Sequence, residues 1–220
     1  MYFVGRSRET NRIIKALERR ENVIVSGRFG MGRTSLVQYI SKIAQDKWRF
    51  VFIDFSKTPG DICRHLVREL FPAHTAREGN NTYGKYKPAR FEILNRALED
   101  KRQHVLVLDN IEKITRQKLA LLQLLTYEKR FLFMAITASF LPERQYHQLK
   151  VVLLATCRIT LGHMSPSSTK EFFTHFSKEN NFNWTDDHIR NLSRRTQGYP
   201  LSMKEVVGIT QKQQPVLPEE

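Results

Sequence analysis

The stretch VSGRFGMGRTSL, from Val25 to Leu36, constrains the fold of this chain more than any other. It follows an apolar run and precedes a segment whose apolar residues recur at helical spacing. Gly27, Gly30 and Gly32 suit a loop whose backbone N–H groups converge on a phosphate at the positive end of a helix, because side chains would block that approach. The order strand, glycine turn, helix predicts a phosphate-binding loop in an α/β domain. The alternative is an ordinary turn between a strand and a helix.

One residue departs from the usual motif G-x-x-x-x-G-K-[ST]. Arg33 stands where the motif has lysine, and it keeps the positive charge on a longer, planar fork. Thr34 is placed for its hydroxyl to reach Mg²⁺. The residues expected to bind the phosphates are Gly27, Arg28, Phe29, Gly30, Met31, Gly32, Arg33, Thr34 and Ser35.

The stretch HVLVLDN predicts a second element of the same site. Its apolar run ends in Asp109, the pattern of a Walker B strand, so Asp109 is expected to lie across from Thr34 and to share Mg²⁺ with it. The next residue, Asn110, is where many such ATPases carry the glutamate that activates water, and an amide cannot act as a base. Glu112 is a possible substitute. The alternative is that Asp109 only caps the next helix.

The alternation of predicted strands and helices gives the domain plan. Strands are expected at 22–26, 49–55, 104–110, 130–139 and 156–164, and only helices after that; the segment 145–155 is open between helix and strand. The plan predicts a mostly parallel sheet covered on both faces in residues 1–163, a helical lid in 164–212 and a flexible tail in 213–220. Thr137, at the end of the fourth strand, is the first candidate for sensing the γ-phosphate, and Ser139 is the second.

Charge points to the kind of partner. The 220 residues contain 36 Lys and Arg against 22 Asp and Glu, a formal net charge of +14, which favours DNA or another polyanion. The 40% of hydrophobic residues is enough for a core. No apolar run reaches the roughly 20 residues of a membrane span, and no secretory signal is apparent, so the sequence predicts a cytoplasmic protein with no membrane association.

Five stretches together resemble a known family. FVGRSRE, GRFGMGRT, VLVLDN, AITAS and GYPLSMKE occur in the order found in AAA+ P-loop ATPases. The chain looks most like the branch with STAND-type ATPases, origin-recognition-type ATPases and transposition ATPases of the TnsC/TniB kind. The resemblance runs from Phe3 to about Gln211. It implies a five-stranded parallel sheet of order 5-1-4-3-2, a small helical lid, and ATP with Mg²⁺ as ligands.

The resemblance also implies roles for residues outside the loop. Val4, Gly5 and Arg6 belong to a segment that lies over the adenine in such families, and Pro200 belongs to a lid motif near the base. Family members commonly complete the site with an arginine from a neighbouring subunit, for which Arg144 is the first candidate and Arg158 the second.

Three functions remain open from the sequence. The first is an ATP-dependent switch that forms homo-oligomers and acts with DNA, like a transposition or recombination regulator, with slow hydrolysis because of Arg33 and Asn110. The second is a STAND-type signalling or scaffold ATPase whose partner is a protein. The third is a degenerate fold that binds no nucleotide and serves as an interaction module.

Overall fold

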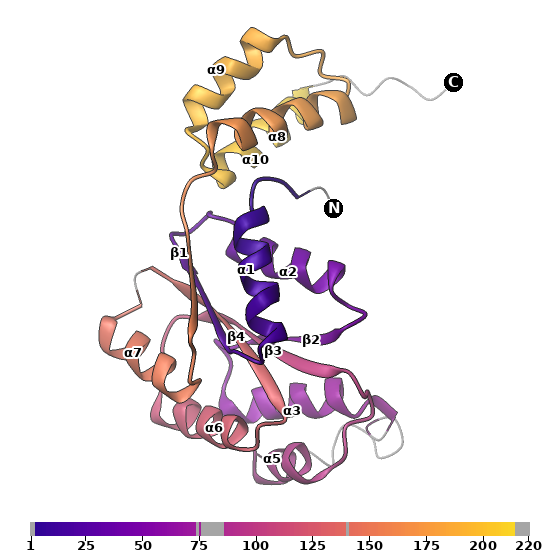
Figure 1. The fold of residues 1–220 in the computed structure, drawn as a ribbon, viewed down its shortest axis with the longest axis vertical. Helices are drawn as coiled ribbons and strands as arrows, with labels where there is room; N and C mark the ends of the chain where they lie inside the picture. The colour runs from indigo at the N-terminus through magenta and orange to yellow at the C-terminus, as the bar shows by residue number, and fades with distance from the viewer. Residues whose placement is uncertain (1–2, 74, 76–85, 140, 214–220) are drawn as a thin grey trace.

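The computed structural model describes residues 3–73, 75, 86–139 and 141–213, and in these residues helices cover both faces of one parallel sheet (Figure 1). The strands are β1 (Val23–Gly27), β2 (Trp48–Asp54), β3 (Gln103–Ile111), β4 (Phe131–Ala138) and β5 (Cys157–Leu161). The helices around them are α1 (Ser7–Glu18), α2 (Arg33–Ile43), α3 (Pro59–Leu70), α5 (Tyr86–Asn95), α6 (Arg116–Tyr127) and α7 (Glu143–Val152). Three more helices gather at one end, α8 (Pro166–Glu179), α9 (Asp186–Thr196) and α10 (Pro200–Gln213).

The sheet has the predicted topology. Its strand order is β2-β3-β4-β1-β5, which is 5-1-4-3-2 counted from the other edge, and every pairing is parallel. β1 therefore lies between β4 and β5, with Val25 opposite Ile136 on one side and Ile159 on the other. The expected order of a P-loop AAA+ sheet is confirmed.

Each face of the sheet has its own hydrophobic core. Val23 and Val25 of β1 pack with Ile13, Leu17 and other residues of the α1–α2 layer. Ile24 points to the other face, where α3, α5, α6 and α7 supply the core. Because successive strand side chains alternate between faces, a strand buried on both sides must be apolar throughout, as the VIV and VLVL runs are.

The three terminal helices enclose a smaller core of their own. Its buried members are Phe172, Phe173, Ile189, Leu192, Met203 and Val207. Ser165 and Thr185 cap α8 and α9 by accepting hydrogen bonds from the backbone N–H groups of Ser168 and His188. Val4 and Met164 pack against this core, so the N-terminal segment joins the helical part to the sheet part.

Some boundaries differ from the sequence-based expectations. The helix expected at about 89–101 is α5, which begins at Tyr86 and ends at Asn95. Asp100 instead accepts the backbone N–H of Arg102 on its side chain, a local turn that competes with a helix. The segment 145–155, left open between helix and strand, is helical in α7. The tail predicted at 213–220 lies outside the described residues beyond Gln213.

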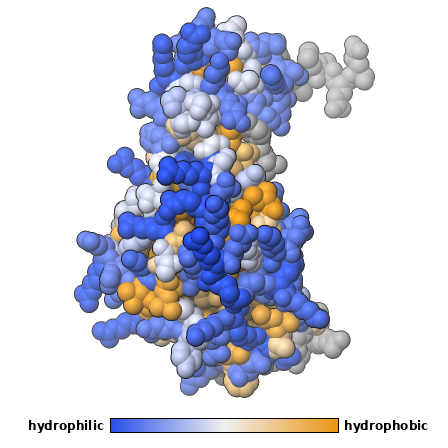
Figure 2. All heavy atoms as spheres, in the orientation of Figure 1, coloured by the Kyte–Doolittle hydropathy of each residue, from blue (hydrophilic) through white to orange (hydrophobic). Residues whose placement is uncertain are grey.

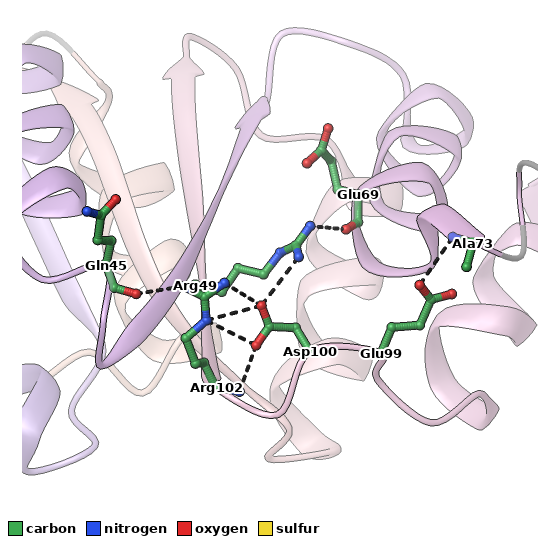
Figure 3. Close-up of polar contacts among 7 residues, drawn as sticks. All are labelled: Gln45, Arg49, Glu69, Ala73, Glu99, Asp100 and Arg102. Atoms are coloured by element: carbon green, nitrogen blue, oxygen red, sulfur yellow. Dashed lines mark hydrogen bonds and ion pairs between the residues drawn. The ribbon is translucent and has the colours of Figure 1, made fainter.

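A polar network joins the edge of the sheet where β2 and β3 begin (Figure 3). The carboxylate of Asp100 accepts hydrogen bonds from the guanidinium groups of Arg102 and Arg49. Arg102 also donates a 2.7 Å hydrogen bond to the carbonyl of Gln45, just after α2, and Arg49 donates one of 2.7 Å to the carbonyl of Glu69, near the end of α3. The hydrogen bonds from Arg102 hold the pKa of Asp100 far below its ordinary value. Ion pairs therefore fix the end of the sheet where β2 and β3 begin. The candidate site described below lies at the opposite end, where the strands finish.

Candidate nucleotide-binding site

The site lies at the carboxyl edge of the sheet, where β1 ends at Gly27 and β3 ends at Ile111. Ligands of open α/β sheets bind at this edge, because the loops that leave the strands diverge there. A cavity of about 350 Å³ opens between these loops. Its wall consists of Phe29, Gly30, Gly32, Arg33, Thr34, Ser35, Asp109, Asn110, Ile111, Glu112 and Ala138. The tertiary structure therefore brings the glycine loop and the end of β3 to one cavity.

Thr34 and Asp109 meet in this cavity. The hydroxyl of Thr34 donates a 3.0 Å hydrogen bond to Oδ2 of Asp109. The other carboxylate oxygen, Oδ1, accepts the backbone N–H of Asn110 at 2.8 Å. A hydroxyl and a carboxylate oxygen at this separation are hard oxygen donors of the kind that Mg²⁺ prefers, so the residues fit a Mg²⁺ ion held together with phosphate oxygens.

The glycine loop has the backbone geometry of an anion site. Gly30 and Gly32 have φ of 76° and 78°, a conformation that favours glycine. Gly32 is the N-cap residue of α2, and no side chain caps this helix. The first N–H groups of α2 and its positive dipole end are therefore available to a phosphate in the cavity.

Arg33 is the first residue of α2 and lines the cavity. Burial lowers its pKa, and the nearby carboxylate of Asp109 raises it. A guanidinium remains protonated under such shifts, so Arg33 contributes a positive charge beside the phosphate loop. The charge that the motif requires is therefore present in the cavity, carried by a different group.

Asn110 lies at an irregularity in β3. Its φ is 57°, and the register of β3 with β4 shifts between Leu108 and Ile111. Its side-chain amide donates a 3.3 Å hydrogen bond to Oδ1 of Asp54, at the end of β2. The pKa of Asp54 lies below its ordinary value, mainly because the hydroxyl of Ser56 donates to the carboxylate. Asn110 thus pairs with a carboxylate and supplies no base.

Thr137 does not reach the cavity wall. Its side chain is 0% exposed, and its hydroxyl has no hydrogen-bond partner among the described residues. The next residue, Ala138, lines the cavity instead, because neighbouring strand residues point to opposite faces. The second candidate, Ser139, is exposed, and its backbone N–H donates to the carbonyl of Gly27 at 3.1 Å.

A second cavity, of about 200 Å³, adjoins the loop under the helical lid. Its wall consists of Phe3, Val4, Arg6, Gly30, Met31, Gly32, Ser35, Met164, Phe172, Pro200, Leu201, Met203 and Lys204. It brings together Val4, Arg6 and Pro200, three residues that the family resemblance places near the base. Gly5 has a different place: a Cβ there would lie 2.6 Å from the Cβ of Ser168, so this glycine allows α8 to pack closely.

Arg6 connects three segments of the chain. It is 6% exposed, and its guanidinium donates to the carbonyls of Gly162 at 2.6 Å and Met31 at 3.4 Å. It also forms an ion pair with Glu9 at 3.2 Å. Arg6 therefore positions the glycine loop against the end of β5, a role that the motif alone did not indicate.

The helical lid, formed by α8, α9 and α10, contacts the glycine loop directly through Tyr199, the residue before α10. The hydroxyl of Tyr199 donates a 2.9 Å hydrogen bond to the carbonyl of Phe29. A Cβ on Gly30 would come within 2.4 Å of that hydroxyl oxygen, so the close approach requires glycine. The sequence did not predict a role for Tyr199, although this residue lies inside the stretch GYPLSMKE.

The two candidate arginines from the sequence lie outside both cavities. Arg144, near the start of α7, is exposed. Arg158 of β5 is also exposed, and its guanidinium lies 4.9 Å from the ring centroid of Tyr146. Neither contributes to the cavities of its own chain.

With this geometry established, comparison with known proteins identifies the family. Residues 2–134 match the family model described as the AAA ATPase domain, so the chain belongs to that family. Nucleotide binding is the property that the family implies. No curated protein sequence matches the chain.

Solved structures with the same fold include several AAA+ proteins. The Aeropyrum pernix Orc1 protein in complex with DNA has a TM-score of 0.73 and 14% identity over 97% of this chain and 62% of its own. Cdc6p from Pyrobaculum aerophilum has a TM-score of 0.66 and 13% identity over 94% of this chain and 62% of its own. The replication initiator DnaA bound to AMPPCP and single-stranded DNA has a TM-score of 0.60 and 10% identity over 96% and 63%.

These likenesses define the fold. This chain spans less than two thirds of the length of each of those proteins.

None of the helices in the described part of the chain combines the length and apolar character needed to cross a bilayer.

Proposed function

We propose that this protein is an ATP-dependent switch that binds ATP with Mg²⁺ between the sheet and the lid. The observation that carries the proposal is the hydrogen bond between Thr34 and Asp109 at the positive end of α2. It supports a site in which both side chains hold the metal and the loop N–H groups hold the phosphates. The adjoining cavity that contains Val4, Arg6 and Pro200 would receive the base.

Two residues support binding with slow hydrolysis. Arg33 supplies the positive charge on a planar guanidinium, which is bulkier than the ammonium group of lysine. Its contacts with the phosphates would therefore differ in geometry from those of the usual lysine. Asn110 pairs with Asp54 and cannot take a proton from water. ATP would then act mainly by joining the lid to the sheet, through the loop that Tyr199 already contacts.

We further propose that the protein forms homo-oligomers and acts with DNA, in the manner of a transposition or recombination regulator. The formal net charge of +14 supports a polyanionic partner. The structural neighbours include proteins solved with DNA. In such an assembly Arg144, or else Arg158, would approach the γ-phosphate bound to a neighbouring subunit.

Calorimetry with ATP, with and without Mg²⁺, tests the nucleotide site directly. Binding that strengthens with Mg²⁺ is the expected result, and no binding under either condition would leave only the interaction-module function. Sedimentation with and without ATP tests oligomer formation. Titration with duplex DNA over a range of salt tests the partner, because phosphate contacts make affinity fall steeply with salt.

A STAND-type signalling ATPase is the second candidate. The packing of the lid on the loop, through Tyr199 and Gly30, favours it, because such a contact can convert nucleotide state into lid position. The DNA titration separates the two candidates. A protein that binds ATP but no duplex at low salt would support the signalling function.

A further inference from the structure

The outer face of α1 carries a row of cations. Arg8, Arg12, Lys15 and Arg19 are all exposed, the last at the residue that follows the helix. Their spacing of four, three and four residues places them within a sector of about 60° of the helix circumference, at about 100° per residue. The row is about 16 Å long. In Figure 2 strongly hydrophilic side chains gather over the part of the surface where Figure 1 places α1.

No carboxylate neutralises this row within the described part of the chain. The two acidic residues of α1 have other partners: Glu9 pairs with Arg6 at 3.2 Å, and Glu18 pairs with Lys47 at 2.9 Å. Arg12 has a polar contact, but with a backbone carbonyl, that of Arg158 at 3.2 Å. The four charges therefore remain available to an external anion.

The row lies on a rigid support. The opposite side of α1 buries Ile13 and Leu17 in the core, so the backbone under the cations is fixed. Like charges at i,i+3 and i,i+4 repel one another, and the helix dipole offsets this repulsion for the two cations at the C-terminal end of α1, Lys15 and Arg19. The four side chains are thus held on one exposed face of a fixed helix, as a docking surface for an extended anion requires.

We propose that this row binds the phosphate backbone of duplex DNA. The inference rests on the proposed function, and it specifies where the DNA lies. Each strand of a duplex carries one charge per about 3.4 Å of axis, so the row matches the rise of several consecutive phosphates. Arginine and lysine contacts of this kind fix position along the duplex without reading sequence.

The test compares two variants that lose the same charge. In the first, Arg8, Arg12, Lys15 and Arg19 are all changed to Gln. In the control, four exposed cations on α3, α6, α7 and α9 are changed to Gln: Arg68, Arg116, Lys150 and Arg195. Each set contains three arginines and one lysine. The probe is a fluorescently labelled duplex of random sequence, titrated over a range of salt.

The α1 variant is expected to lose more than about tenfold in affinity at low salt, and its slope of log affinity against log salt should become shallower by about 3 to 4. The control should stay close to the wild type. Equal losses in both variants would overturn the proposal, because net charge alone would then explain the binding. So would α1-dependent binding to anionic lipid vesicles without binding to the duplex.

Two further readouts keep the result interpretable. The melting temperature of the α1 variant should stay within a few degrees of the wild type, since the four side chains are exposed and the buried residues of α1 are unchanged. If the wild type itself binds no duplex, the DNA part of the proposed function fails. If the wild type binds and the α1 variant binds as well as the control does, only the assignment to α1 fails.

Discussion

The hydroxyl of Thr34 donates a 3.0 Å hydrogen bond to the carboxylate of Asp109, across 75 residues of sequence. The bond joins the first turn of α2 to the end of β3, two strands away from β1 in the sheet. It forms because β1, β4 and β3 are parallel, so that the loops after β1 and β3 leave the same edge.

Thr34→Ala should weaken Mg²⁺-dependent ATP binding by at least about tenfold, because it removes an oxygen proposed to hold the metal. Thr34→Ser keeps that oxygen and is the matched control. Calorimetry in the presence of Mg²⁺ and in EDTA measures both. Equal losses in the two variants, or a loss that persists in EDTA, would contradict the metal role of Thr34.

Arg33→Ala should weaken ATP binding strongly, because it removes the charge that lines the cavity beside the loop. Arg33→Lys keeps the charge and restores the usual motif, so it should retain affinity and raise turnover. Affinity and steady-state phosphate release measure the two effects. An Arg33→Ala protein that binds ATP like the wild type would show that the side chain does not contact phosphate.

Asn110→Glu should speed hydrolysis if a missing base limits turnover. The structure adds a complication, because the new carboxylate would face that of Asp54, which now accepts the amide at 3.3 Å. A double variant, Asn110→Glu with Asp54→Asn, avoids this repulsion because an amide still faces a carboxylate. It should raise single-turnover hydrolysis by at least about tenfold, since a general base contributes about 10² to 10⁴.

The control for this exchange is Asn110→Gln, which keeps an amide and should hydrolyse ATP no faster than the wild type. Rapid hydrolysis by the wild type would refute the premise that a base is missing.

Tyr199→Phe should loosen the lid, because it removes the donor to the carbonyl of Phe29 at a cost of about 1 kcal/mol. Gly30→Ala should have a larger effect, since φ there is 76° and the new Cβ would meet the Tyr199 hydroxyl. Gly208→Ala is the control: it has free space around the new Cβ and lies inside α10. Hydrogen exchange of the loop amides measures lid contact. Loop exchange in Tyr199→Phe and Gly30→Ala that is no faster than in Gly208→Ala would contradict a role of this contact in holding the loop.

His104 should make stability depend on pH. It is 0% exposed, and both ring nitrogens lack hydrogen-bond partners among the described residues. Burial lowers its pKa below the ordinary value of about 6.5, so below that pH the unfolded chain binds more protons. Stability is therefore complete above about pH 6.5 and falls as the pH drops toward the folded pKa.

Denaturant titration of the wild type and of His104→Leu over this pH range measures the effect. The variant should show a smaller loss between about pH 6.5 and 5, because it has no proton to bind at that position. Parallel curves for the two proteins would indicate that His104 does not titrate on unfolding.

Local sequence patterns were sufficient for most elements of the sheet. The apolar runs that end at Gly27 and Asp109 identify strands buried on both faces, and glycines at 30 and 32 identify the loop. Both signals, the run of apolar residues and the position of the glycines, can be read from a few consecutive residues. The segment 145–155 could not be classified in the same way, because its apolar residues suit either a helix or a strand until the packing of α7 is known.

The sequence by itself determined the class of fold and predicted the two halves of the proposed metal site, because each half lies within one contiguous motif. Only the tertiary structure decided that Thr137 is buried away from the cavity, that Asn110 pairs with Asp54, and that Tyr199 reaches Phe29. These outcomes depend on which strand face a side chain occupies and on where the lid lies. Both are set by long-range packing, which a local window does not contain.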